Sequence, residues 1–199
     1  SKIVNLSPLS KYTGSAYTQL GNISMKNGDL NKAAEYYSKV IENRRNAEEE
    51  RNNAKYMLAR INFYKGDLEK VKEILGEILS NLKDNTANDA IELSLLVNTK
   101  MNDSTNLIKF AEAELLTEKK EFRESLNIYR EISENPDAFM LKNLAEFREA
   151  QMEVALDNYE KSLEILSALT ENTEMNIYSD KALYLLGKVY RYGVEDAAK

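Results

Sequence analysis

A short turn motif recurs along this chain of 199 residues, and its spacing is the feature that most limits the possible fold. Asn27-Gly28-Asp29-Leu30 and Lys65-Gly66-Asp67-Leu68 are near copies, and weaker versions occur at Lys120-Glu121-Phe122 and Asp157-Asn158-Tyr159. The four motifs end at Leu30, Leu68, Phe122 and Tyr159, at separations of 38, 54 and 37 residues. The intervals of 38 and 37 residues agree within one residue, and the interval of 54 residues is longer by roughly one helix. This repetition predicts a chain built from stacked units of one kind.

Each unit is predicted to consist of two helices joined by this turn. Apolar residues follow helical spacing on both sides of it, for example at Tyr17, Leu20 and Ile23 before the first turn. Gly28 suits a left-handed helix end, because a Cβ is costly in that conformation. Asp29 suits the N-cap of the next helix, because a carboxylate accepts hydrogen bonds from free backbone N–H groups. Such a hairpin cannot bury its apolar face alone, so neighbouring hairpins are expected to stack.

Small residues recur in the first helices, at the places where helices must approach closely. They are Gly21, Ala59, Ala113, Ala150 and Gly187. Replacing Gly21 or Gly187 by Leu is therefore expected to overpack a helix crossing and to cost about 1–3 kcal/mol.

The pattern resembles the tetratricopeptide repeat, whose signature places an aromatic residue, Leu-Gly and Tyr in the first helix, then Ala and an aromatic residue in the second. The closest match to the first helix is Leu183, Leu186, Gly187 and Tyr190. The first unit supplies Tyr17, Leu20, Gly21, Ala33 and Tyr37, with Ser24 where Tyr is expected. The resemblance covers about residues 12–199. It implies an all-α fold, a right-handed α-solenoid of stacked antiparallel helix hairpins, with a superhelical groove lined by the first helices.

We expect a single array over residues 1–199. The hairpin units are expected at about residues 12–45, 46–83, 104–137, 138–172 and 175–199, the last of them truncated. One segment does not fit the period: an extra helix at about 86–102, which is apolar on most sides and is predicted to be buried.

The last unit is expected to lack its second helix, because Glu195–Lys199 would supply only a first turn. Its first helix should therefore expose an apolar face, which would fray or associate with another molecule, a second copy included. The start of the sequence resembles the tail of a preceding unit, so we expect the chain to be part of a longer array.

Composition excludes several function classes. The chain has no Cys, His or Trp, which removes thiol catalysis, imidazole acid–base chemistry and zinc sites built on Cys or His. Seven Gly and two Pro are too few for a sheet protein with many turns. A net charge of −6 argues against nucleic acid as a partner. No apolar run is long enough for membrane insertion, and no phosphate-binding loop is present. We expect no enzymatic activity, no metal and no cofactor; the compartment, cytoplasmic or periplasmic, stays open.

The resemblance also implies which residues bind a partner. In each first helix, the residue three positions before the small residue and the residue one position after it are expected to face the groove. The predicted partner-binding residues are Tyr56, Phe110, Phe147 and Tyr184, then Arg60, Gln151 and Lys188, and beyond these Phe63 and Tyr64. Aromatic residues give large contact area at low entropy cost, and Arg or Lys pair with acidic groups. The alternative is that this aromatic stripe packs between first helices as ordinary core.

Two main functions compete on the sequence alone. The first is a non-catalytic scaffold that binds a peptide or protein on its concave face. The second is a structural or assembly component of a bacterial envelope complex, which would use its ends or convex face. A sensor of small ligands is a third possibility, but the sequence shows no converging polar cluster for an enclosed pocket.

Overall fold

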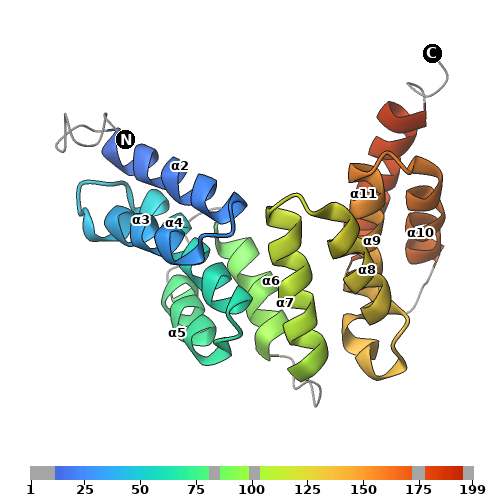
Figure 1. Cartoon of the computed structure of the whole chain (residues 1–199), viewed down its shortest axis with the longest axis horizontal. Helices are drawn as coiled ribbons and strands as arrows, with labels where there is room; N and C mark the ends of the chain where they lie inside the picture. Colours follow the sequence, from blue (N-terminus) through green and yellow to red (C-terminus); the bar gives the residue numbers. More distant parts are fainter. Residues whose placement is uncertain (1–11, 81–85, 99–103, 172–177, 195–199) are drawn as a thin grey trace. The chain divides into compact units, whose positions relative to one another are not determined.

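The chain is helical throughout the part that the structure describes. The computed structural model describes residues 12–80, 86–98, 104–171 and 178–194, and within these ranges it contains helices and turns but no strand. Within each of the two compact units given below, consecutive helices pack against each other, as in an α-helical repeat protein (Figure 1). The all-α repeat fold predicted from the sequence is therefore confirmed. The chain divides into two compact units, Ser1–Lys100 and Met101–Lys199.

Within its described residues, the first unit holds two complete hairpins and one further helix. In chain order its helices are α2 (Thr13–Lys26), α3 (Leu30–Glu42), α4 (Glu48–Tyr64), α5 (Leu68–Leu79) and α6 (Thr86–Asn98). The pairs α2–α3 and α4–α5 are the hairpins, and α4 also packs on α3 and α2 (Figure 1).

The second unit repeats this arrangement. Its elements are α7 (Ser104–Glu118), α8 (Phe122–Ser133), the short 3-10 helix η1 (Pro136–Ala138), α9 (Phe139–Ala155), α10 (Tyr159–Glu171), α11 (Ser179–Val189) and the π-helix η2 (Tyr190–Val194). The pairs α7–α8 and α9–α10 are complete hairpins, and α11 packs on α10.

The four hairpin turns share one backbone conformation. The central turn residue has a positive φ in each: 75° at Gly28 and Gly66, 63° at Lys120 and 62° at Asp157. In each turn the next backbone N–H donates to the carbonyl five residues earlier, over 2.8–2.9 Å. This is the bonding of a Schellman motif, which ends a helix with a left-handed residue. The weak sequence versions of the motif therefore form the same turn as the strong ones.

The predicted N-caps are also present. The side chains of Asp29 and Asp67 each accept a hydrogen bond of 3.1 Å from a backbone N–H three residues later, at Lys32 and Lys70. Each cap satisfies a donor that the helix itself leaves without a partner.

A buried motif recurs in every second helix: a small residue, a large residue four positions later and an aliphatic residue three positions after that. Its members are Ala33, Tyr37 and Val40 in α3, Val71, Leu75 and Ile78 in α5, Ser125, Tyr129 and Ile132 in α8, and Ser162, Leu166 and Leu169 in α10. None of the twelve is more than 3% exposed. The spacing puts all three residues of a motif on one helix face, and we call it the covering motif.

The covering motif packs on the small residue of the preceding first helix. A Cβ built on Gly21 would lie 2.6 Å from the ring of Tyr37. In α8 and α10, Ser125 and Ser162 donate hydrogen bonds of 2.9 and 3.0 Å to the carbonyl oxygens of the small residues in α7 and α9. The small residues are needed because the second helix lies directly against them.

The extra helix differs from its prediction. It is α6, and it buries Ala90, Leu93 and Val97 but leaves Ile91 40% and Leu95 58% exposed, so the prediction that it is buried on most sides is wrong. The helix packs on α5 and α4, as α4 packs on α3 and α2, and it therefore occupies the place of a first helix. The last part of the predicted segment, 99–102, lies outside the described residues.

The last first helix, α11, has an exposed face, as the sequence predicts. Ala182 and Val189 are buried, whereas Leu183 is 60% and Tyr190 55% exposed. A Cβ on Gly187 would meet no atom within 4 Å, so the prediction that a larger residue there overpacks a crossing is wrong. No described helix covers this position. The predicted start of a second helix at 195–199 lies outside the described residues.

Candidate functional site

The predicted binding residues flank the small residues of the first helices. Tyr56 and Arg60 lie on either side of Ala59 in α4, and Tyr184 and Lys188 on either side of Gly187 in α11. The structure separates these residues into a buried group and an accessible group, which is the distinction that a binding surface requires.

Three predicted groove residues are core. Phe63, Phe110 and Phe147 are 3%, 1% and 5% exposed, so their prediction as surface residues is wrong. The Phe110 ring centre lies 5.4 Å from that of Tyr129, and the Phe147 ring stacks on Tyr178 at 6.3 Å. These rings fill space between packed helices, and the alternative interpretation of the aromatic stripe as core holds at these positions.

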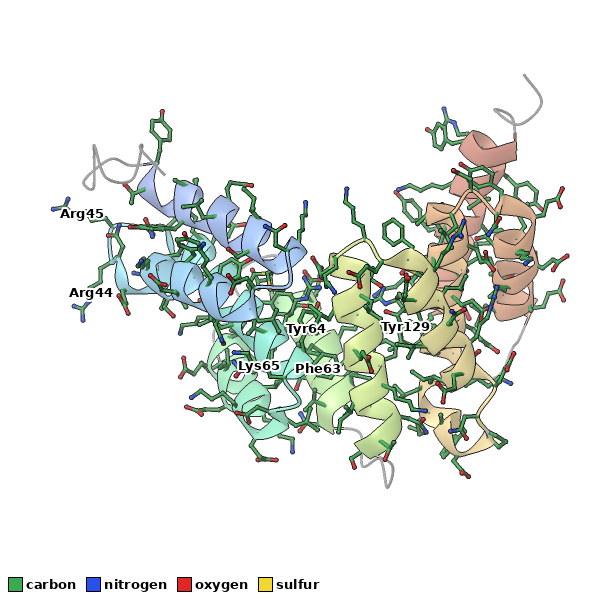
Figure 2. The ribbon with its side chains drawn as sticks, in the orientation of Figure 1. Arg44, Arg45, Phe63, Tyr64, Lys65 and Tyr129 are labelled. Atoms are coloured by element: carbon green, nitrogen blue, oxygen red, sulfur yellow. The ribbon has the colours of Figure 1, made fainter. Side chains whose placement is uncertain are left out.

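The accessible residues of the first unit form a line on α4. Tyr56, Arg60 and Tyr64 follow one another at intervals of four residues and are all half-buried. The guanidinium of Arg60 donates to the hydroxyl oxygen of Tyr64 and lies 5.5 Å from the centre of its ring. Figure 2 labels Tyr64 beside the buried Phe63 at the C-terminal end of α4. We call these three residues the tyrosine–arginine stripe.

A second aromatic group lies on α2 and α3 of the same unit. The rings of Tyr17 and Tyr36 stack with their centres 6.1 Å apart, and the ammonium of Lys39 lies 5.6 Å from both. Lys39 also donates to Glu35 over 2.5 Å, and this hydrogen bond is the main cause that raises the pKa of Lys39. This lysine already has a carboxylate partner, so the group joins α2 to α3 rather than offering a free charge.

In the second unit, the corresponding positions form a polar network that joins three helices. One oxygen of Glu114 on α7 accepts from the Tyr129 hydroxyl on α8 at 2.9 Å and from Arg148 Nε on α9 at 2.7 Å. Arg148 also donates to the amide oxygen of Gln151, the predicted site residue, at 2.9 Å. The side chains of Glu114 and Arg148 are 17% and 27% exposed, so the network is partly open to solvent.

Burial dominates the electrostatics of this network. Loss of water around Tyr129 raises the pKa of its phenol, and the negative charge of Glu114 raises it further. Tyr129, which Figure 2 labels, therefore acts as a neutral hydrogen-bond donor that holds the Glu114 carboxylate in place. Hydrogen bonds among these side chains fix their positions and join the three helices.

A second ionic network is structural. Arg130 on α8 donates to Glu149 at 2.8 Å and to Glu153, whose side chain is fully buried. Asn158 in the following turn donates to the other oxygen of Glu153 at 2.7 Å. The buried carboxylate is thus paired and hydrogen-bonded, as burial requires. This network fixes α8, α9 and their connection to α10.

The predicted site residues on α11 are exposed. Tyr184 is 67% exposed, and the ammonium of Lys188 lies 4.5 Å from the centre of its ring. Arg191 stacks in the same way over Tyr192, at 5.2 Å. Aromatic rings that carry a cation on an exposed helix are suited to contact with another macromolecule.

Sequence reasoning missed Arg148 and Tyr129 as members of the polar network. One signal was present: Glu114 and Arg148 have opposite charges and are 34 residues apart, which is one tetratricopeptide period.

The difference in net charge between the two units could also be read from the sequence. Residues 1–100 carry 15 basic and 13 acidic residues, a net +2, whereas residues 101–199 carry 12 and 20, a net −8. Arg44 and Arg45 contribute to the first value and point into solvent (Figure 2).

Two further properties concern the described residues alone. None of their helices combines the length and apolar character that a membrane crossing needs. Within the same ranges, no three acidic side chains gather in a way that could hold a metal ion.

Helix hairpins joined by Schellman turns, each with a covering motif over a small residue, define an α-helical repeat protein. The tetratricopeptide repeat family model matches residues 14–46, which form the α2–α3 hairpin. This hairpin is therefore similar to a tetratricopeptide repeat, which supports the resemblance seen in its sequence. Repeats of this family generally mediate protein–protein interaction and are typically non-catalytic. No curated protein and no solved structure matches the chain.

Proposed function

We propose that this chain is a non-catalytic scaffold, and that a protein or peptide partner binds the tyrosine–arginine stripe of its first unit. The observation that carries the proposal is the accessibility of Tyr56, Arg60 and Tyr64, since the phenylalanines predicted for the same surface are buried. The interaction role of the tetratricopeptide family supports it.

The chemistry of the stripe indicates the kind of partner. Tyrosine and arginine are the residues that most often dominate binding energy at interfaces, because they combine large apolar area with directed hydrogen bonds. The guanidinium of Arg60 is held over the Tyr64 ring, so little side-chain entropy remains to be lost on binding. The unit that carries the stripe has a net charge of +2. A segment with carboxylate side chains therefore fits best.

The test compares two charge reversals in the full chain. Arg60→Glu changes the stripe, and Lys70→Glu makes the same change at an exposed residue of α5 that pairs with Glu73. Proteins retained by the unchanged chain should be lost with Arg60→Glu and kept with Lys70→Glu, while both variants melt close to the parent.

Retention of the same partners by Arg60→Glu would contradict the proposed site. It would instead favour the alternative, a component that braces a larger assembly through its ends or its outer face. Loss of partners by both variants alike would show that overall charge, and not the stripe, controls binding.

A further inference from the structure

Each hairpin has a pair of equivalent positions, one on each helix, beside its covering motif. The first position lies four residues before the small residue of the first helix. The second lies two residues after the large residue of the covering motif. We call the residues at these positions the bridging pairs; in chain order they are Tyr17 with Lys39, Lys55 with Glu77, Lys109 with Glu131, and Glu146 with Ala168.

Three of the bridging pairs join their two helices. In the second hairpin, Lys55 Nζ donates to Glu77 at 2.9 Å. In the third, Lys109 donates to Glu131. In the first, the ammonium of Lys39 lies 5.6 Å from the ring centre of Tyr17. These positions therefore bring a cation on one helix against a carboxylate or an aromatic ring on the other.

The fourth bridging pair contains no cation. Glu146 on α9 is paired in register with Ala168 on α10, an exposed residue whose methyl group cannot bind a carboxylate. The Glu146 carboxylate lies 3.9 Å from Lys142 Nζ, one turn earlier in the same helix, which is beyond hydrogen-bond distance. Residues 172–177, which follow α10 in the sequence, contain no Lys or Arg. The bridging position on α10 therefore offers Glu146 no charge.

Burial increases what this carboxylate would gain from a cation. The side chain of Glu146 is 29% exposed, compared with 57% for Glu77 and 60% for Glu131. Loss of water raises the pKa of Glu146, and the attraction of Lys142 does not offset this effect. An ion pair is stronger where less water surrounds it, so a cation beside Glu146 would be bound more firmly than one beside a solvated carboxylate.

Charge and apolar area indicate the chemistry of an occupant. Residues 101–199 carry 12 basic and 20 acidic residues, a net −8, which favours a basic partner. Phe139 begins α9 seven residues before Glu146, on the same side of the helix, and is 72% exposed. A segment with Lys or Arg close to an apolar residue therefore fits this surface.

We propose that α9 and α10 bind a basic segment of a partner protein, whose Lys or Arg passes over Ala168 and pairs with Glu146 while an apolar residue contacts Phe139. The partner's cation completes the fourth bridging pair, as Lys55 completes the second. The small side chain of Ala168 leaves room for it. This surface lies in the second unit and does not depend on the tyrosine–arginine stripe of the first.

NMR titration of the isotope-labelled full chain with two synthetic peptides tests the proposal. The first peptide is an amphipathic helix of Leu and Lys, and the second has Glu in place of each Lys. The basic peptide should shift the resonances of Phe139, Glu146 and Ala168, and it should bind more weakly at high salt. The acidic peptide should leave these resonances unchanged.

Matched variants separate a specific contact from overall charge. Glu146→Gln should weaken binding of the basic peptide at least about fivefold, because the peptide loses an ionic hydrogen-bond partner. Glu164→Gln removes the same charge from an exposed residue of α10 and should weaken binding much less. Ala168→Lys should also weaken binding, because the new ammonium pairs with Glu146. Its control is Ala155→Lys, the same change at an exposed residue of α9. None of these residues belongs to the core, so all four variants should fold.

Three results would overturn the proposal. The first is the absence of shifts at Glu146 and Ala168 with about 1 mM basic peptide, the scale of very weak binding. The second is an equal effect of Glu146→Gln and Glu164→Gln, or of the two lysine variants, which would show that net charge alone controls binding. The third is a dimer of the parent that Glu146→Gln dissociates, which would assign the surface to a second copy of this chain instead of a separate partner.

Discussion

Alanine at Gly21 and at Gly187 should change stability in opposite directions, although both glycines hold the same place in a first helix. At Gly21 the new methyl group would lie 2.6, 2.7 and 3.0 Å from three ring atoms of Tyr37. The ring has little freedom to move, because it is 0% exposed and its hydroxyl donates to Asn22 at 2.7 Å. At Gly187 the methyl group would meet nothing within 4 Å.

The magnitudes follow from two opposing effects. Alanine in a helix interior is favoured over glycine by about 0.8–1.0 kcal/mol, and Gly187→Ala should gain most of this. Overpacking a close helix contact costs about 1–3 kcal/mol, so Gly21→Ala should lose about 0–2 kcal/mol after the same gain.

Thermal unfolding of the two variants and the parent measures the difference. A separation of about 1–3 kcal/mol corresponds to melting temperatures roughly 2–12 °C apart for a chain of this size. The double variant Gly21→Ala with Tyr37→Leu reproduces the Ala59–Leu75 pairing of the second hairpin and should recover part of the loss. Equal melting temperatures for the two alanine variants would refute the conclusion that Gly21 lies in a close helix contact and Gly187 does not.

Three further predictions concern the turns, the aromatic stripe and pH. Lys120→Gly should raise the free energy of unfolding by about 1 kcal/mol in denaturant titration, because a left-handed φ is costly for a residue with a Cβ. Asp157→Gly should gain less, since Asp tolerates this conformation. The Asp157 carboxylate also accepts a hydrogen bond of 2.8 Å from the Tyr159 hydroxyl, which the glycine variant loses. Phe147→Ala should lower the free energy of unfolding by about 3–5 kcal/mol, because it truncates a buried side chain. Tyr56→Ala should change the melting temperature little, because Tyr56 is only half-buried. Similar losses of stability for the two variants would show that Tyr56 also belongs to the core. Burial raises the pKa of Glu146, so ionising its carboxylate destabilises the folded chain as pH rises through that pKa. Glu146→Gln should therefore melt at a higher temperature than the parent at pH 7 and at the same temperature at pH 4. A lower melting temperature of the variant at pH 7 would contradict this.

The repeat was readable from the sequence because its signals are local. Gly28 and Gly66 identify two helix ends by conformational freedom alone, and the structure gives both a φ of 75°. Lys120 and Asp157 carry no such signal, and only their distance from the other turns indicated that they end helices. The spacing of the covering motif was equally accessible, since it depends on one helix face.

Burial of the aromatic residues was not readable in the same way. Phe110 and Phe147 hold the place of Tyr184 in the repeat, yet the first two are core and Tyr184 is 67% exposed. The difference depends on which helices lie next to each residue, and a helix register does not contain that information. The polar partners Glu114 and Arg148 come from different hairpins, so their contact also depends on tertiary packing.

The central claim is that the second helix of each described hairpin packs directly over the small residue of its first helix, whereas α11 has an exposed face around Gly187. Hydrogen exchange of the full chain, measured by mass spectrometry, tests this most directly, because amide protection reports local opening. We predict that α11 exchanges at least about ten times faster than α9, which α10 covers. Protection of α11 equal to that of α9 would contradict the claim.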